Sequence, residues 1–217
     1  MLLSYVNGYT IDLSSVEKLE QQAITQTYTK DRIHVENSEL YVYMKPLDGD
    51  GLTGLSRTSH RQRDEILINV NECVSQNNKP ITYKTHIKMM ENMNWFAKIN
   101  AWYHVYQIKL HGRNRPLLTV GIKNENLVLY NCDGFYPIII GNIHNYWNRW
   151  LYIKIHVVPD KNNIKIYYTF EGKTGQITCI KNMKLKKIIY LKLGQYRSYP
   201  NTITDTTITM YKNIICN

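Results

Sequence analysis

The sequence lacks the features that mark membrane-spanning and exported chains. Its 217 residues contain no run of about 18 apolar residues, so we expect no membrane span. The first residues, Met1–Gly8, show neither a basic region nor a long apolar core, so we expect no secretory signal and a soluble protein. Hydrophobic residues still make up 43% of the chain, which excludes a disordered polar chain. We therefore predict a single domain over residues 1–217, with residues 1–35 as an N-terminal decoration made of a strand and a helix.

Cysteine is scarce and scattered. The four cysteines (Cys73, Cys132, Cys179 and Cys216) form no CxxC pair, which excludes the usual zinc-ribbon and thioredoxin patterns. Since no secretory signal accompanies them, we expect reduced thiols in the core rather than a disulfide framework. The histidines show no metal-ligand spacing, so we expect no metal and no cofactor.

Acidic residues are outnumbered. The sequence has 27 Lys and Arg residues against 17 Asp and Glu residues, a net charge of +10. A surplus of that size favours a polyanionic partner such as an acidic polysaccharide, a nucleic acid or an acidic membrane. No nucleic-acid-binding motif accompanies the charge, so nucleic acid is the weaker candidate. The 18 tyrosines, against 3 phenylalanines, suit strands and hydrated binding faces.

Helical periodicity is sparse, and alternation with a period of two dominates. Ile81–Met89 puts apolar side chains on one face and polar or basic ones, including Lys84, on the other. Similar or shorter strand signals occur at Leu40–Met44, Glu65–Val70, Tyr103–Leu110, Leu117–Ile122, Leu127–Tyr130, Leu151–Val157, Ile164–Tyr168, Gln176–Ile180, Ile188–Tyr196 and Thr206–Ile215. The series predicts an all-β fold, a concanavalin-like jelly-roll β-sandwich. One short N-terminal helix is also expected, because Ser14 and Glu17 have the spacing of a capping box.

Three of the predicted strands carry polar residues on one side, because residues two apart share a strand face. These are Arg63 and Glu65 on the first strand, Gln107, Lys109 and His111 on the second, and Tyr190, Lys192 and Tyr196 on the third. If the three strands are neighbours, they form a basic groove that contains tyrosines. Each group also has a purely structural interpretation: a cross-strand ion pair, an exposed strand face, or packing tyrosines.

The three motifs, in this order, resemble those of the jelly-roll polysaccharide lyases, especially the family 7 alginate lyases. That family reads R-(S/T)-E-L, then Q-(I/V)-H, then Y-F-K-A-G-x-Y. This sequence has Arg63-Asp64-Glu65-Ile66, Gln107-Ile108-Lys109 and Tyr190-Leu191-Lys192-Leu193-Gly194-Gln195-Tyr196. The Ser/Thr-rich stretch 56–60 also resembles the family's lead-in to the arginine motif. The resemblance covers roughly residues 40–215.

The resemblance implies that an anionic, uronate polysaccharide is bound and cut by β-elimination. In that reaction Arg63 and Gln107 would neutralise the uronate carboxylate, and Tyr190 would be the general acid. Lys192 would bind substrate charge, and Glu65 would hold Arg63 in place. The other expected substrate-binding residues are Tyr196, Lys84 and His111.

One position departs from the family pattern, because Lys109 stands where the family has histidine. Lysine has a pKa of about 10.4 and is normally charged at neutral pH. Lys109 can act as the base only if burial or neighbouring cations, such as Arg63 and Lys192, lower its pKa. Otherwise Lys109 is a fixed positive charge and Tyr190 is both base and acid. His111 is a second candidate for the missing imidazole, although it is expected in the following turn.

A second hypothesis follows from the same departure. The chain would be a catalytically inactive jelly roll, reused for glycan binding or as a viral structural or attachment protein, virion-associated or released. It would bind acidic glycans in a salt-sensitive way without turnover.

Overall fold

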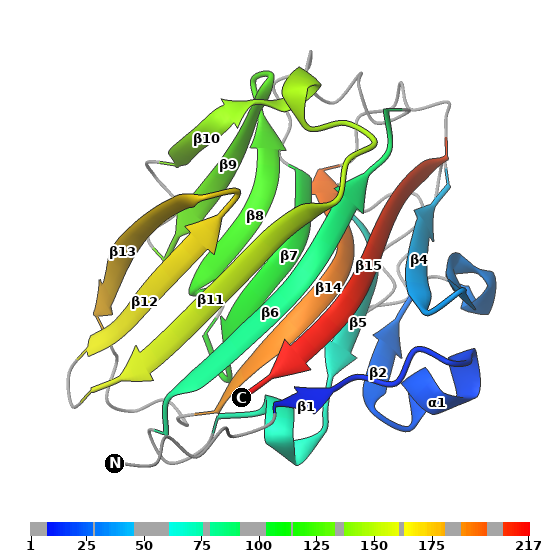
Figure 1. Cartoon of the computed structure of the whole chain (residues 1–217), viewed down its shortest axis with the longest axis horizontal. Coiled ribbons are helices and arrows are strands. Elements are labelled where there is room, and N and C mark those ends of the chain that lie inside the picture. Colours follow the sequence, from blue (N-terminus) through cyan, green and yellow to red (C-terminus); the bar gives the residue numbers. More distant parts are fainter. Residues whose placement is uncertain are drawn as a thin grey trace.

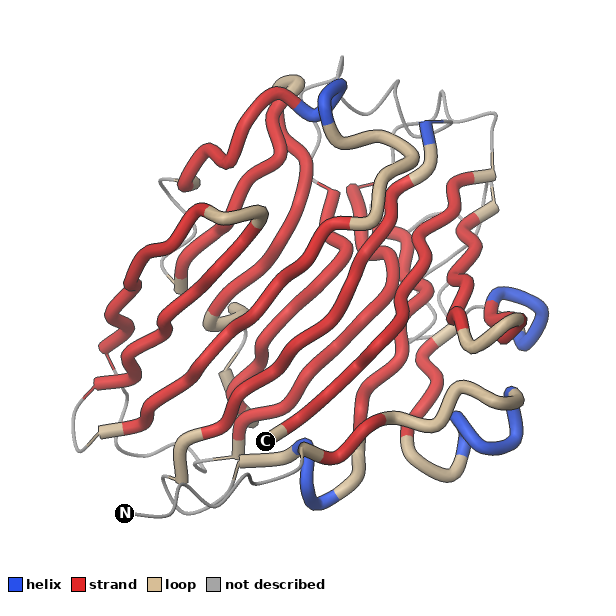
Figure 2. Tube along the Cα trace, in the orientation of Figure 1, coloured by secondary structure: helices blue, strands red, loops and turns tan. Residues whose placement is uncertain are grey.

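The computed structural model describes residues 8–27, 29–45, 61–75, 79–91, 103–113, 115–132, 137–160, 163–180, 188–198 and 206–217. Two antiparallel sheets pack face to face in a jelly-roll β-sandwich, which confirms the predicted all-β fold (Figures 1 and 2). None of the described helices is long and apolar enough to cross a membrane.

The eight-stranded sheet lies at the front in Figure 1. Its strand order is β13-β12-β11-β6-β15-β4-β3, and β1 pairs with β15. The strands are β1 (Tyr9–Thr10), β3 (Ile33–Glu36), β4 (Glu39–Met44), β6 (Ile81–Met89), β11 (Leu151–Pro159), β12 (Asn163–Phe170), β13 (Lys173–Ile180) and β15 (Thr207–Cys216).

The seven-stranded sheet lies behind it, with the order β10-β9-β8-β7-β14-β5-β2. Its strands are β2 (Ala23–Gln26), β5 (Arg61–Ile68), β7 (Tyr103–Leu110), β8 (Leu118–Lys123), β9 (Asn126–Asn131), β10 (Ile138–Asn142) and β14 (Ile189–Ser198). The sequence predicts one strand, without bounds, within residues 1–35, whereas the structure has β1, β2 and β3 in this part of the chain; β10 had no strand signal. In this N-terminal segment, β1 and β3 join one sheet and β2 joins the other.

The short N-terminal helix exists as α1 (Val16–Glu20), but it begins one residue later than the sequence predicts. Its N-cap is Ser15, whose hydroxyl accepts from the backbone N–H of Lys18 at 3.2 Å. Ser14 instead donates its backbone N–H to the Asp12 carboxylate at 2.9 Å, which turns the chain before the helix starts. The other helical turns among the described residues are the 3-10 segments η1 (Lys30–Arg32), η2 (Asn71–Cys73) and η4 (Ile143–Asn145).

The core lies between the sheets and is built by the alternation seen in the sequence. In β6 the residues Ile81, Tyr83, Thr85, Ile87 and Met89 are buried, and the residues between them are partly exposed. Alternate residues of β11 and β14 also point inward. Each sheet therefore has a mostly apolar inner face, although buried polar residues such as Gln195, Arg197 and Thr207 hydrogen-bond to one another between the sheets. The outer face of each sheet can carry polar chemistry.

The cysteines correct the prediction of reduced thiols. Cys73 is bonded to Cys216, with Cα atoms 5.1 Å apart, and Cys132 is bonded to Cys179, with Cα atoms 5.9 Å apart. The sandwich topology brings η2 beside the end of β15, and the end of β9 beside β13, across long stretches of sequence. Each disulfide thus joins a segment that belongs to or follows the seven-stranded sheet to a strand of the eight-stranded sheet.

Candidate active site

The three strands with the polar motifs are direct neighbours in the order β7-β14-β5, as the groove prediction requires. In β14, Tyr190 pairs with Lys109 and Lys192 pairs with Gln107. The same strand places Tyr196 opposite Arg63. Because the alternate residues of these strands fill the core, the polar motifs lie on the outer face of the seven-stranded sheet.

Glu65 is the centre of the cluster. Its Oε1 accepts a hydrogen bond from the Gln107 amide nitrogen. Its Oε2 lies 3.0 Å from Lys192 Nζ and 3.5 Å from Arg63 Nε. Glu65 is only 2% exposed, and a buried carboxylate is tolerated only when it is paired and hydrogen-bonded. The expected role of Glu65 in holding Arg63 therefore extends to Lys192 and Gln107.

An aromatic wall adjoins the cluster. The Arg63 guanidinium carbon lies 4.4 Å from the centre of the Tyr196 ring, a cation–π distance. The ring of His104 lies 6.0 Å from the Tyr196 ring and 5.3 Å from the Tyr130 ring. Burial, with a smaller effect from Lys109, lowers the pKa of His104 to about 3, so this imidazole is neutral at pH 7.

The sequence did not indicate His104 or Tyr130 as part of this face. Simple alternation from Gln107 places His104 on the core side. The pairing of β7 with β8 shifts register between His104 and Tyr106, so β7 takes up one extra residue there. That bulge returns His104 to the face that holds Tyr196. A β-bulge has no reliable signal in a single sequence.

The environment of Lys109 lowers the pKa of its amine toward neutral pH. Burial, and then the positive charge of Lys192, lower the pKa of Lys109 to about 8, with smaller lowering effects from Arg63 and Arg113. The negative charge of Glu65 opposes this shift. Burial raises the pKa of Tyr190, the cross-strand partner of Lys109, and Glu65 adds to that effect while Arg63 opposes it. A lysine of lowered pKa therefore lies beside a tyrosine of raised pKa.

Two expected substrate-binding residues lie away from this cluster. Lys84 is on β6 of the eight-stranded sheet, and its buried neighbours Tyr83 and Thr85 show that it faces outward there. It is therefore on the opposite side of the sandwich, because it belongs to the sheet that does not carry the motifs. His111 is exposed in the turn after β7. Residues 56–60 lie outside the described residues.

The part of the chain that the structure describes contains no group of three or more His, Cys, Asp or Glu residues placed to hold a metal ion. The cluster instead offers cationic and amide donors. Arg63, Lys192 and Lys109 are cations, and Gln107 supplies an amide beside a single carboxylate. Such a donor set fits an anionic ligand.

No protein-family model and no curated protein sequence matches the chain. Solved structures do match its fold. An alginate lyase of polysaccharide lyase family 7 aligns with a TM-score of 0.63 and 18% identity, over 97% of this chain and 93% of that one. The alginate lyase from Corynebacterium sp. aligns with a TM-score of 0.55 and 13% identity, over 87% of this chain and 82% of that one.

An alginate lyase in complex with dimannuronate also matches, with a TM-score of 0.58 and 13% identity. It aligns over 87% of this chain and 78% of its own. At these identities the likeness establishes the fold: this chain has the jelly-roll sandwich seen in alginate lyases.

Proposed function

We propose that the outer face of the seven-stranded sheet binds an acidic, uronate-containing polysaccharide and cleaves it by β-elimination. The observation that carries this proposal is the cross-strand pair of Lys109 and Tyr190, one with a lowered and one with a raised pKa, beside a cationic cluster. Two titratable groups whose environments push their pKa values apart are the usual arrangement for acid–base chemistry. Alginate is the first substrate to test, because the structural neighbours are alginate lyases.

Binding of the uronate carboxylate falls to Arg63 and Gln107. Gln107 has two N–H groups on its amide nitrogen, and its hydrogen bond to Glu65 uses one of them. Arg63 is held from two sides, by Glu65 and by the Tyr196 ring. These side chains are fixed before substrate arrives. They can therefore stabilise the negative charge that develops on the carboxylate when the C5 proton leaves.

The proton transfers fall to the cross-strand pair. The neutral amine of Lys109 takes the proton from C5 of the uronate. The electrons of that C–H bond form the C4–C5 double bond, and the bond from C4 to the glycosidic oxygen breaks. Tyr190, whose raised pKa keeps its hydroxyl protonated, gives its proton to the departing oxygen. The products are one polysaccharide fragment with a new reducing end and a second fragment that begins with an unsaturated uronate.

The test is the rise in ultraviolet absorbance of the unsaturated uronate. The panel is alginate, polymannuronate, polyguluronate, glucuronan and heparinoids, each incubated with the native chain and with Tyr190→Phe. We expect turnover of at least one polymer, and a loss of about 100-fold to 10,000-fold in Tyr190→Phe, the usual contribution of a general acid. Phenylalanine keeps the ring, so polymer binding should survive. Absence of turnover by the native chain on the whole panel would contradict cleavage of these substrates.

Binding without turnover is the second candidate function. It is favoured by one observation, that a lysine with a pKa of about 8 is mostly protonated at pH 7 and below. In that state Lys109 adds a positive charge beside Arg63 and Lys192. Retained binding of an acidic glycan by a chain that shows no absorbance rise at any pH would support this candidate.

A further inference from the structure

The opposite side of the sandwich also carries a concentration of positive charge. Five lysines lie on the outer face of the eight-stranded sheet, and we call this surface the outer basic face: Lys84, Lys88, Lys154, Lys165 and Lys212. They come from four adjacent strands in the order β12-β11-β6-β15. None of them belongs to the candidate active site, which is on the other sheet.

The centre of this face is electrostatically unfavourable by itself. Lys154 on β11 is the direct cross-strand partner of Lys84 on β6. Like charges directly opposite each other destabilise a sheet. Within the described part of the chain, no ion pair is found for either lysine. Two carboxylates lie elsewhere at this face: Glu39 is 3.4 Å from Lys212, and Glu171 accepts a hydrogen bond from the Tyr152 backbone N–H and acts electrostatically on His86. An anion bound between Lys84 and Lys154 would relieve this repulsion.

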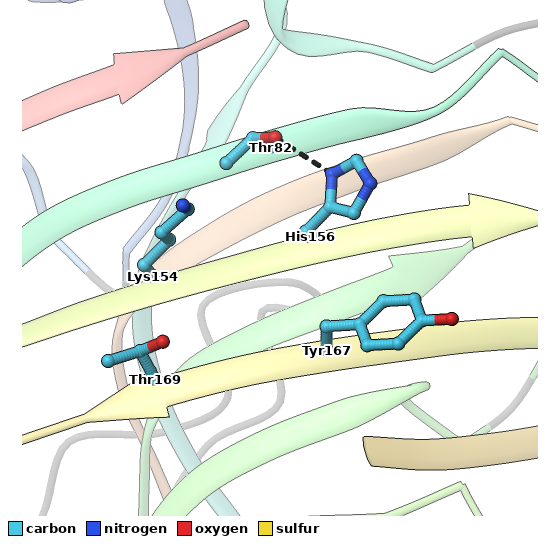
Figure 3. Close-up of a pocket in the computed structure, with 5 residues that line it drawn as sticks. All are labelled: Thr82, Lys154, His156, Tyr167 and Thr169. Carbon is cyan, nitrogen blue, oxygen red and sulfur yellow. Dashed lines mark hydrogen bonds between the residues drawn. The ribbon is translucent and has the colours of Figure 1, made fainter. Parts of the chain in front are cut away.

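A shallow pocket adjoins the lysine pair, and Figure 3 shows the residues that line it. Its volume is about 370 Å³, and its lining residues are Thr82, Lys154, His156, Tyr167 and Thr169. The Thr82 hydroxyl and His156 Nδ1 are 2.9 Å apart, so they hold each other in place. The pocket combines an ammonium group, two threonine hydroxyls, a phenol hydroxyl and an imidazole. These are donors that suit carboxylate and hydroxyl groups of a sugar.

Aromatic rings lie among the lysines. Tyr167 is 40% exposed, and its ring centre lies 6.0 Å from that of His156. Farther along the same face, the Trp150 ring lies 4.1 Å from Lys212 Nζ and 5.7 Å from Lys88 Nζ. The exposed Tyr167 ring and the half-buried Trp150 ring, each on a face that carries lysines, present apolar area together with charge. A polymer of charged sugar rings offers the matching combination.

We propose that the outer basic face is a second binding surface for an acidic polysaccharide. The polysaccharide would cross β6, β11 and β12, with an anionic group between Lys84 and Lys154 and a sugar ring in the pocket against Tyr167. The choice of a glycan over other polyanions rests on the proposed function. The positive charge of the face is observed independently of that function. A surface on the opposite sheet from the cleavage site would hold the protein on a long polymer without occupying the site itself.

The test uses the full chain with Tyr190→Phe, so that the polymer is not cut. Affinity for polymannuronate is compared between this background and the same chain with Lys84→Gln and Lys154→Gln. The matched control removes the same charge at Lys18 and Lys79, which are exposed and lie outside both sheets. We expect the Lys84/Lys154 variant to bind about tenfold more weakly, as for loss of a charge-assisted contact, and the control to change by less than about twofold. Backbone amide shifts should move in β11 and β12 when the polymer is added.

Several results would overturn the proposal. Unchanged affinity in the Lys84/Lys154 variant would show that this surface does not bind the polymer. An equal loss of affinity in the Lys18/Lys79 control would show that only the overall charge of the protein matters. Tighter binding of duplex DNA than of polymannuronate, lost in the same variant, would replace the glycan by a nucleic acid. The amide shifts keep this test separate from the proposed function, because they report on β11 and β12 even if no variant of the chain shows turnover.

Discussion

At the scale of single residues, the sequence predicts which residues lie together in the candidate site better than it predicts their protonation states. Alternation was sufficient to place Arg63, Glu65 and Lys192 on strand faces, and the structure brings them together around one carboxylate. It could not decide how Lys109 is protonated, since a pKa depends on burial and on charges from other strands. Those contributions become visible only when β7, β14 and β5 are seen side by side.

The state of Lys109 leads to a prediction about pH. A base must be neutral to accept a proton, so kcat/KM should rise as pH increases through about 8, the pKa of Lys109. It should fall again only in strongly alkaline solution, where Tyr190, whose pKa is raised above its ordinary value, loses the proton that it must donate. Lys109→His should keep activity and move the rising limb toward about 6.5, the ordinary pKa of imidazole. The measurement is the pH dependence of kcat/KM on the polymer that is cleaved.

The control for this prediction is Lys109→Gln, which keeps a polar, though shorter, side chain that cannot take the proton. It should lower kcat by about 100-fold or more, as for loss of a general base. A rising limb that stays in place in Lys109→His would show that Lys109 is not the base. Tyr190 would then be left to carry both proton transfers.

At the scale of elements, β14 decides the geometry of the site, and its irregularity was hidden in the sequence. Its pairing with β7 shifts register between Leu193 and Tyr196. Gly194 lies in this irregular stretch with φ of +128°, a conformation that side chains disfavour. A Cβ there would lie 2.4 Å from the Asp64 carbonyl oxygen and 2.5 Å from the Glu65 Cα. The pattern of alternating residues predicts the strand, but it does not show that glycine is required by the close approach of β5.

Gly194→Ala should therefore push β14 away from β5 and disturb the contacts of Glu65. We expect a loss of about 1–3 kcal/mol in the free energy of unfolding, from backbone strain and overpacking, together with a fall in turnover. The matched control is Gly172→Ala, because Gly172 also has a positive φ, of +78°, but nothing within 4 Å of an added Cβ. Urea unfolding of both variants measures the difference. Equal losses would mean that the close approach of β5 contributes nothing beyond the φ angle.

At the scale of the whole molecule, the period-two pattern is enough to predict a sandwich, but not its short strands or its covalent links. The strands β1, β2 and β3 contain too few residues for alternation to stand out, and they form by pairing with longer strands at the sheet edges. Cysteine pairing depends on which segments meet in three dimensions. Cys73 and Cys216 are 143 positions apart, so their spacing in the sequence carries no sign that they meet.

Reduction of the two disulfides should make the protein markedly less stable, because both bonds connect the two sheets. A disulfide stabilises chiefly by restricting the unfolded chain, by about 2–4 kcal/mol, and it contributes more when it closes a longer loop. The Cys73–Cys216 bond spans 143 residues and the Cys132–Cys179 bond spans 47. We expect Cys73→Ala with Cys216→Ala to lower the melting temperature by about 5–10 °C, the shift that such a loss gives in a chain of this size. Cys132→Ala with Cys179→Ala should lower it less.

Melting curves of the native chain and of the two double variants, each with and without a reductant, measure this order. Thiol titration of the unfolded native chain should find no free cysteine before reduction. Four reactive thiols, together with melting temperatures unaffected by the reductant, would restore the prediction of a reduced core. If the disulfides form, the protein matures in an oxidising environment, since such bonds are rarely kept where thiols are held reduced.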